Sequence, residues 1–385
     1  MKNINRRDFI KLSAATGTSI AFMGIFNACE DYTFEPVTGG SEKTFITDIQ
    51  DFYTQFGNST TSVDNLPNVT KASWQLEISG LVDTPKTFSF SELEALASEH
   101  EMTYFKTMRC VFDAGAFEKY ISNAYWTGVP LKVLLEQAGI QSSAKRLRIF
   151  GSDGFTNNIL LSDVMKETPE GELPIILCYK MNGEELPLKQ GFPVRVIFPE
   201  KFGFKNMKWI SKIELTDVDE PFGVYEVDYG IFDDGDLKPI SYITAPLTNE
   251  NLSQNLTEGK YTVLGTALTG RNKPQKVEVR IDDGDWKDAS IASREEVENQ
   301  VRTFVTEKEG RLPSEFIEQF KNPDAFSYPF KNTWVVWKYD FEVTGTGAVK
   351  ISARVTDETG FTQPEEDNTF DDGNVSIQTV DASKG

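Results

Sequence analysis

The chain has 385 residues, of which 39% are hydrophobic and 25% are charged, values typical of a folded protein with room for two domains. Its formal net charge of -20 argues against binding to nucleic acid or to an anionic membrane surface. A single histidine and 3 cysteines exclude a bis-histidine haem, a multi-histidine metal site and a disulfide scaffold. The histidine, His100, stands in a polar acidic run, which indicates a surface residue and not a catalytic base.

The first 28 residues have the features of an export signal. A twin-arginine motif spans Asn5 to Lys11, and the apolar run after it is too short and too rich in small residues to span a membrane. A lipobox-like sequence then ends at Cys29, so we expect a periplasmic protein anchored by a lipid on this residue. Twin-arginine export carries folded proteins, which favours a complex cofactor. Residues 29–44 are polar and predict a tether.

A lone cysteine, Cys110, ends an apolar run that predicts a strand leading into a loop. A helix is predicted soon afterwards from Leu131, with Pro130 at its first turn and Gly139 just past its end. Such a loop between two packed elements would hold a reactive or metal-binding sulfur rigidly. The alternative is a buried thiol that behaves as a small hydrophobe, which is the commoner case for this residue type.

Basic residues gather in the segment 191–210. Alternation from Val194 to Phe198 predicts a strand that turns Arg195 away from the apolar face, and Lys205 and Lys208 follow around a glycine-containing loop. An arginine fork and free backbone N–H groups suit a phosphate, so the segment predicts a pocket for an anionic group. A solvated basic face is the alternative.

We expect two folded domains after the tether. Residues 45–238 predict an α+β domain, with strands at 74–80, 147–149 and 174–177, a helix opening at Phe90 and a hairpin turn at 181–184. Residues 239–385 predict an all-β, immunoglobulin-like sandwich, with alternating strands at 276–281, 335–343 and 349–355. The sandwich carries an insertion at 290–330, whose charged part is predicted to be helical and exposed.

Taken in order, these motifs resemble the sulfite oxidase superfamily of molybdenum enzymes. The sequence at 108–110 with 126–131 is similar to the segment that carries the family's molybdenum-binding cysteine. The sequences at 181–183 and 191–195 are similar to its pterin-phosphate strand, and 202–210 to the loop that closes over the cofactor. The resemblance implies a sulfite-oxidase-type molybdopterin domain followed by an immunoglobulin-like dimerisation domain.

The same resemblance implies that Cys110 binds molybdenum beside one pyranopterin, and that no haem is present. Residues near Tyr53 resemble a strip that covers the pterin in the periplasmic methionine sulfoxide reductase branch. The implied cofactor contacts are Gln50, Tyr53, Thr54, Ser152, Gln190, Arg195, Lys205, Asn206, Met207 and Lys208.

The chain departs from the family where sulfite would bind. Thr54 and Gly115 stand at two positions where sulfite oxidases carry arginines that surround the oxyanion. A dianion needs local cations to offset its desolvation, so a sulfoxide or related compound is the better expected substrate. A true sulfite oxidase and a non-catalytic surface lipoprotein are the alternatives. An oxo-transfer enzyme of this kind would exchange electrons with a separate carrier, such as a c-type cytochrome or a membrane quinone-linked subunit, and would form a homodimer.

Overall fold

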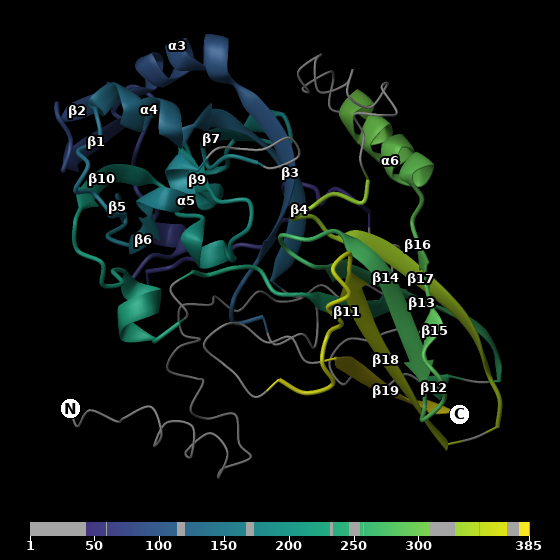
Figure 1. The fold of residues 1–385 in the computed structure, drawn as a ribbon. Coiled ribbons are helices and arrows are strands. Elements are labelled where there is room, and N and C mark those ends of the chain that lie inside the picture. The colour runs from purple at the N-terminus through teal and green to yellow at the C-terminus, as the bar shows by residue number, and fades with distance from the viewer. Residues whose placement is uncertain are drawn as a thin grey trace.

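The computed structural model describes residues 44–58, 60–113, 120–166, 173–231, 234–245, 255–256, 258–307, 328–345, 347–367 and 377–384. The expected export signal, Cys29, nearly all of the tether and Gly115 therefore lie outside the described residues. Within the described part of the chain, no helix is long and apolar enough to cross a membrane. A mixed α/β body, built from the N-terminal part, lies beside an all-β domain built from the C-terminal part (Figure 1).

The first sheet of the N-terminal domain has five strands, in the order β2 (Lys86–Ser89), β1 (Gln75–Gly80), β10 (Ile210–Thr216), β5 (Arg146–Gly151) and β6 (Thr156–Leu160). Its central strand β10 pairs in parallel with β1 and antiparallel with β5. Along β1, Leu76 and Ile78 are buried between more exposed neighbours, because only one face of this segment is apolar. The predicted strand at 74–80 is confirmed.

The second sheet contains the strand that leads to Cys110. Its strands are β3 (Met102–Arg109), β4 (Ile121–Pro130), β7 (Ile176–Met181) and β8 (Glu184–Glu185), with β9 (Arg195–Ile197) paired to β7. Asn182 and Gly183 join β7 to β8 with φ of 51° and 77°, as the predicted two-residue hairpin turn requires. Cys110 directly follows β3, as predicted.

Three α-helices cover these sheets: α3 (Phe90–His100), α4 (Leu131–Ala138) and α5 (Leu161–Met165). A capping box between Ser89 and Glu92 begins α3. The apolar face of α4 is fully buried, and Gly139 ends the helix with a φ of +71°, so the predicted helix is confirmed. Single turns of other types occur at η1 (Val63–Asn65), η2 (Leu188–Gln190), η3 (Gly203–Lys205) and the π-helix η4 (Val224–Asp228).

Two sheets form the C-terminal domain. One has the order β11 (Ile240–Ala245), β13 (Gly259–Leu268), β17 (Val335–Val343) and β16 (Ser290–Ile291). The other has the order β12 (Asn255–Leu256), β19 (Gln378–Lys384), β18 (Gly347–Asp357), β14 (Pro274–Ile281) and β15 (Lys287–Asp288). Inward-facing residues of both sheets, such as Val263, Val279 and Ile351, share one core. The all-β prediction is confirmed; the immunoglobulin-like assignment and the domain boundary stay predictions.

The insertion differs from its prediction in one respect. After the strand β16 at its start it contains α6 (Arg294–Glu307), a helix as expected, but this helix is not simply exposed. Val297 and Val301 are buried, and Phe304 packs beside them against the main core. These residues recur at helical spacing, so they form one apolar stripe that the charged composition of the segment concealed. Residues 308–327 of the insertion lie outside the described residues.

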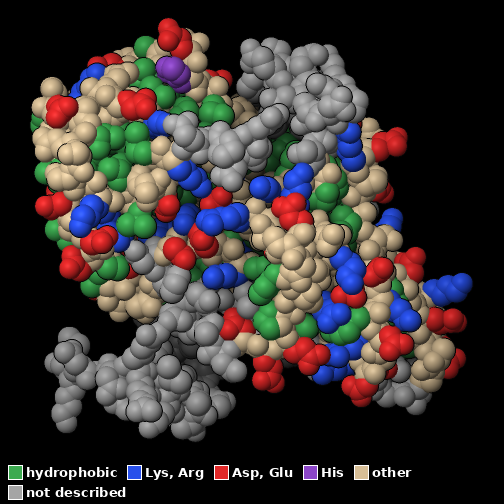
Figure 2. Space-filling model, viewed as in Figure 1, with side chains coloured by type: hydrophobic (Ala, Val, Ile, Leu, Met, Phe, Trp, Pro, Cys, Tyr) green, Lys and Arg blue, Asp and Glu red, His purple; other side chains and the backbone are tan. Residues whose placement is uncertain are grey.

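The two domains meet along β3. The backbone N–H of Thr107 donates to the carbonyl of Asn332 at 2.8 Å, and the Thr107 hydroxyl accepts from the backbone N–H of Trp334 at 2.8 Å. The Trp334 indole donates to the carbonyl of Phe45 at 2.9 Å. Acidic and basic side chains are interspersed over the face seen in Figure 2, with several Lys and Arg side chains near the junction of the domains. The C-terminal domain therefore supports the strand that ends at Cys110.

Candidate functional site

Cys110 lines a cavity of about 50 Å³ in the N-terminal domain. The Cys110 thiol donates to Oε1 of Gln55 at 2.8 Å, and the backbone N–H of Cys110 donates to the carbonyl of Tyr120 at 3.0 Å. The lining comes from four separate parts of the chain besides the Cys110 loop and the π-helix. It consists of Phe52, Tyr53, Gln55, Phe56, Gly57, Met108, Cys110, Asp153, Phe155, Gln190, Arg195, Gly203, Phe204, Asn206, Met207, Lys208, Trp209 and Tyr225.

Arg195 is the first of two cations in this lining. Its apolar neighbours Val194 and Val196 pack into the main core, which turns the guanidinium toward the cavity, as the alternation predicted. The guanidinium donates to the carbonyl and the side-chain oxygen of Gln190 at 3.1 and 3.2 Å, and to the carbonyl of Asn206 at 2.8 Å. Its Nε atom is buried and has no hydrogen-bond partner in the described part of the chain. Burial lowers the pKa of Arg195 to about 10.

Lys208 is the second cation. Its ammonium donates to the carbonyls of Gln55 at 2.9 Å and Lys189 at 2.7 Å, and lies 4.8 Å from the ring centroid of Phe56. Burial, and then repulsion from Arg195, hold the pKa of Lys208 well below its usual range. Among the described residues, no carboxylate forms an ion pair with either cation. Arg195, which is buried, and Lys208, which is half-buried, donate hydrogen bonds only to neutral oxygens, and this arrangement favours an anion.

Trp209 adds a further donor that the sequence analysis did not identify. The Trp209 side chain is 1% exposed and lines the cavity, yet its indole N–H has no hydrogen-bond partner among the residues that the structure describes. Its φ of 49° is unusual for a bulky residue, and such strain is retained mainly at functional sites. The orphan donors on Trp209 and Arg195, with the Lys208 ammonium, match the acceptor oxygens of a phosphate or a pterin.

Another buried cation near Arg195, Lys106, lies on β3 outside the lining. Its ammonium donates to the carbonyls of Thr107 and Lys201, both at 3.0 Å, and the side chain is 0% exposed. Burial and then Arg195 hold the pKa of Lys106 well below its usual range. The signal for this residue was present in the sequence, because Lys106 alternates with Tyr104 and Met108 on a face that is otherwise apolar.

Other predicted contacts divide into two groups. Tyr53, Gln190, Asn206 and Met207 line the cavity, and Thr54 adjoins it through a bond from the Gln190 amide to its hydroxyl at 3.1 Å. Gln50, Ser152 and Lys205 are not in the lining.

Each residue of the second group has another place. Gln50 is exposed, and its backbone N–H donates to Asp48. Ser152 is also exposed, and the adjacent Asp153 lines the cavity instead, with its carboxylate accepting from Phe155 N–H at 3.1 Å.

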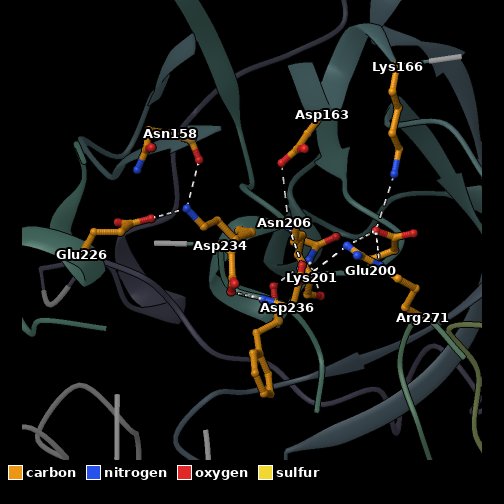
Figure 3. A network of polar contacts seen from close by, with 12 residues as sticks. Asn158, Asp163, Lys166, Glu200, Lys201, Asn206, Glu226, Asp234, Asp236 and Arg271 are labelled. Carbon is orange, nitrogen blue, oxygen red and sulfur yellow. Dashed lines mark hydrogen bonds and ion pairs between the residues drawn. The ribbon is translucent and has the colours of Figure 1, made fainter. Parts of the chain in front are cut away.

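Lys205 points away from the cavity into a buried ion pair. Its ammonium lies 2.5 Å from a carboxylate oxygen of Glu226 and donates to the carbonyl of Asn158 at 3.0 Å (Figure 3). Both side chains of the pair are 1% exposed. The positive charge of Lys205 is thus neutralised inside the protein, in contrast to those of Arg195 and Lys208.

One side of the cavity is aromatic and uncharged. Tyr225, on the π-helix, stacks on Phe204 with centroids 4.9 Å apart and planes at 7°. Phe155 and Phe112 meet the same ring at 5.8 and 5.5 Å. Among the described residues, no group of three or more His, Cys, Asp or Glu side chains is placed to hold a metal ion. Among the described lining residues, the groups that could bind a metal are the thiol of Cys110 and the carboxylate of Asp153, and that carboxylate already accepts hydrogen bonds from the Phe155 N–H and the Thr61 hydroxyl.

Comparisons with known proteins agree with this geometry. Residues 63–222 match the model of an oxidoreductase molybdopterin binding domain, and residues 234–371 match that of a Mo-co oxidoreductase dimerisation domain. The uncharacterized oxidoreductase YuiH of Bacillus subtilis is 30% identical over 148 residues, which cover 38% of this chain and 68% of YuiH. The sulfite oxidase of Arabidopsis thaliana is 22% identical over 88% of this chain and 87% of its own.

Plant nitrate reductases match as well, and that of Solanum lycopersicum is 28% identical over 78% of this chain. The chain spans about a third of the length of these relatives, 35% in this case. Among solved structures, the sulfane dehydrogenase SoxCD from Paracoccus pantotrophus is similar, with a TM-score of 0.68 at 21% identity over 94% of this chain and 90% of that chain. This likeness supports the fold of both domains.

Proposed function

Because this chain belongs to the sulfite oxidase family of molybdopterin-dependent oxidoreductases, we propose that it transfers an oxygen atom to or from a small uncharged substrate, with Cys110 as the metal ligand. One observation carries the proposal. The Cys110 thiol shares a cavity with two cations, the buried Arg195 and the half-buried Lys208, that form no ion pair with a carboxylate among the described residues. A metal thiolate and a phosphate are the two ends of such a cofactor.

Each residue around the cavity is assigned a role in cofactor binding. Cys110, as a thiolate, supplies the metal ligand, and Arg195 and Lys208 bind the phosphate. The indole N–H of Trp209 donates to the phosphate or to a pterin oxygen. Asn206 and Met207 would border the cofactor, Gln190 orients Arg195, and Tyr53 and Thr54 would cover the pterin. When bound, the cofactor supplies a two-electron centre that gives up or accepts an oxygen atom.

Loading of the cofactor requires movement of the strip 53–57. A cavity of about 50 Å³ holds a few water molecules, far less than a pyranopterin occupies. Gln55 closes this space from the strip, because its side chain accepts from Cys110 and its carbonyl accepts from Lys208. Displacing Gln55 frees the two groups that the cofactor needs, so cofactor binding replaces both contacts.

The charge of the lining supports a neutral substrate such as a sulfoxide. The cations of the lining, Arg195 and Lys208, are assigned to the phosphate, and the lining also includes the stacked aromatic rings of Phe204 and Tyr225. Reduction of a sulfoxide consumes two electrons and two protons and yields a sulfide and water, so a separate electron donor is required. Sulfite oxidation is the second candidate, favoured by the sulfite oxidase relative that matches nearly full-length.

Export and assembly are part of the same proposal. The twin-arginine motif and Cys29 support a periplasmic, lipid-anchored protein. The net charge of -20 supports a basic electron carrier, such as a c-type cytochrome, whose association rate falls with ionic strength. The match of residues 234–371 and the two packed sheets support an immunoglobulin-like domain that forms a homodimer.

The test begins with metal and pterin analysis of protein made in a molybdopterin-competent host. We expect about one molybdenum and one pterin per chain in the wild type, and loss of activity with retained fold in Cys110→Ser. Steady-state assays with a redox dye then compare sulfite with sulfoxides. Metal-free wild-type protein would refute the enzyme proposal. A kcat/KM for sulfite of roughly 10⁴ M⁻¹s⁻¹ or more would refute the substrate proposal alone.

A further inference from the structure

Tyr242 reaches from the C-terminal domain to the loop that carries Cys110. This residue lies on β11 and is 0% exposed. Its hydroxyl accepts from Nε of Arg109 at 2.9 Å and donates to a carboxylate oxygen of Asp113 at 2.6 Å. Arg109 precedes Cys110 and Asp113 follows it by three positions, so one hydroxyl joins residues on the two sides of Cys110.

The Arg109 guanidinium completes this connection without entering the cavity. It donates to the carbonyl of Lys238 at 3.4 Å and lies 5.3 Å from the ring centroid of Phe202 and 5.9 Å from that of Tyr242. Burial is the main reason that the pKa of Tyr242 is well above its usual range, so the hydroxyl keeps the proton that it donates to Asp113. Every group in this arrangement is buried, which gives each hydrogen bond more weight than it would have in water.

Arg271 makes a second connection, on the loop between β13 and β14. Its guanidinium lies 2.8 Å from a carboxylate oxygen of Glu200 and 3.2 Å from one of Asp236 (Figure 3). Asp236 also pairs with Lys201 at 2.5 Å. These contacts gather charges from both domains around the segment that begins at Glu200.

Backbone pairing strengthens this second connection. The N–H of Phe202 donates to the carbonyl of Gly235, and the N–H of Leu237 donates to the carbonyl of Glu200, both at 2.8 Å. The segment held in this way continues directly into residues 203–209, all of which except Lys205 line the cavity. Both connections from the C-terminal domain therefore end on segments that form the cofactor site.

We propose that Tyr242 and Arg271 are positioning residues through which the C-terminal domain shapes the cofactor site. Tyr242 fixes the Cys110 loop, and Arg271 fixes the segment that carries Lys208. This assigns the domain a role in the site itself, beyond dimerisation. The inference rests on the proposed function, in which Cys110 binds the metal and Lys208 binds the phosphate.

The experiment uses the full-length, cofactor-loaded protein. Tyr242→Phe removes one oxygen atom and Arg271→Gln removes one charge, and Tyr339→Phe and Arg280→Gln are matched controls on the C-terminal domain away from the cavity. The readouts are the rate of cofactor release, followed by pterin fluorescence, and the electron paramagnetic resonance spectrum of the reduced molybdenum. Melting temperature is recorded for every variant.

We expect Tyr242→Phe to release the cofactor about tenfold faster or more, because it removes hydrogen bonds to two buried charged groups. The molybdenum spectrum should shift, because the thiolate loop loses its fixed orientation. Arg271→Gln should release the cofactor about two- to fivefold faster, since its ion pairs are partly exposed. Salt should reduce the difference between Arg271→Gln and the wild type, and both controls should behave as the wild type.

Release at the wild-type rate with an unchanged spectrum, even with a lower melting temperature, would overturn the inference and leave a purely structural contact. If Tyr242→Phe fails to fold, Arg271→Gln decides, because its side chain is 57% exposed. Wild-type protein without molybdenum would refute the proposed function. Loaded wild type with wild-type behaviour in both variants would refute this inference alone.

Discussion

Buried or partly buried charges occur in two very different arrangements in this protein. Around the cavity, Arg195 and Lys208 meet only neutral oxygens. On the sheet of β14 and β18, the Glu278 carboxylate lies 2.9 Å from the side-chain nitrogens of both Arg354 and Lys276. The guanidinium of Arg354 also stacks on the ring of Trp286. The paired charges around Glu278 stabilise the fold. Arg195 and Lys208, which form no ion pair with a described carboxylate, lower the stability of the fold and mark a ligand-binding site.

Lys205 lies between these two cases, because it belongs to the predicted phosphate loop but is neutralised by Glu226. Breaking this fully buried pair should give the largest loss of stability. We expect Lys205→Met to lower the free energy of unfolding by about 3–5 kcal/mol, since it leaves the Glu226 carboxylate buried without its cation. Chemical denaturation measures the change, with Lys260→Met as an exposed control.

A double variant separates pairing from simple loss of a side chain. Lys205→Met with Glu226→Leu should regain most of the lost stability, because both charges are then absent. A single variant as stable as the wild type would show that the pair is not maintained in solution.

Removing Arg195 or Lys208 should weaken cofactor binding more than it changes the free energy of unfolding. We expect Arg195→Met and Lys208→Met to weaken cofactor binding by about 1.5–3 kcal/mol each, through loss of a charge-assisted contact to phosphate. The unfolding free energy of the cofactor-free protein should change by about 1 kcal/mol or less, because lost hydrogen bonds are offset by relief of the buried charge.

Molybdenum content after stringent washing and denaturation of the cofactor-free protein give the two quantities. Lys212→Met, on the partly exposed β10 surface, is the control. Full molybdenum occupancy in the double variant Arg195→Met/Lys208→Met would count against the assigned roles.

Lowering the pH should remove the stabilisation that the paired charges around Glu278 contribute to the C-terminal domain. Burial raises the pKa of Glu278, but Arg354 and Lys276 outweigh it and leave the pKa below its usual range. A lowered pKa in the folded state means that this stabilisation is present above the ordinary glutamate value of about 4.3 and is lost as pH falls through the lower folded value. Glu278→Gln should therefore cost about 1 kcal/mol at pH 7 and little at the acid end of that window.

Denaturation curves of Glu278→Gln and of the exposed Glu342→Gln, recorded from pH 7 downward, test this. If Glu278→Gln lowers the free energy of unfolding equally at all pH values, Glu278 acts through packing and not through its charge.

Local sequence patterns were sufficient for the framework of the site. The alternation around Arg195 and the apolar run before Cys110 depend on neighbours in the chain, so the strand positions and side-chain directions could be predicted. The grouping of Cys110, Arg195 and Lys208 in one cavity was expected from the family resemblance and agrees with the structure.

The remaining features depend on contacts between distant segments. No local pattern shows that Lys205 finds Glu226, that the Trp209 indole lacks a partner, or that Gln55 closes over Cys110. The exposure of α6 was predicted from its charged composition, which outweighed an apolar stripe that only tertiary packing reveals.

The junction along β3 also bears on how the protein is made. Trp334 bonds to Thr107, 227 positions earlier, and to Phe45, 289 positions earlier. Contacts of such long range form late and slowly, because closing large loops costs entropy before the contacts form. The strand β3, which leads to Cys110, therefore forms its contact with Trp334 only after residue 334 has left the ribosome. A strand whose contacts depend on a segment more than 200 positions later suits a route that translocates folded proteins, as proposed for the twin-arginine motif at residues 5–11.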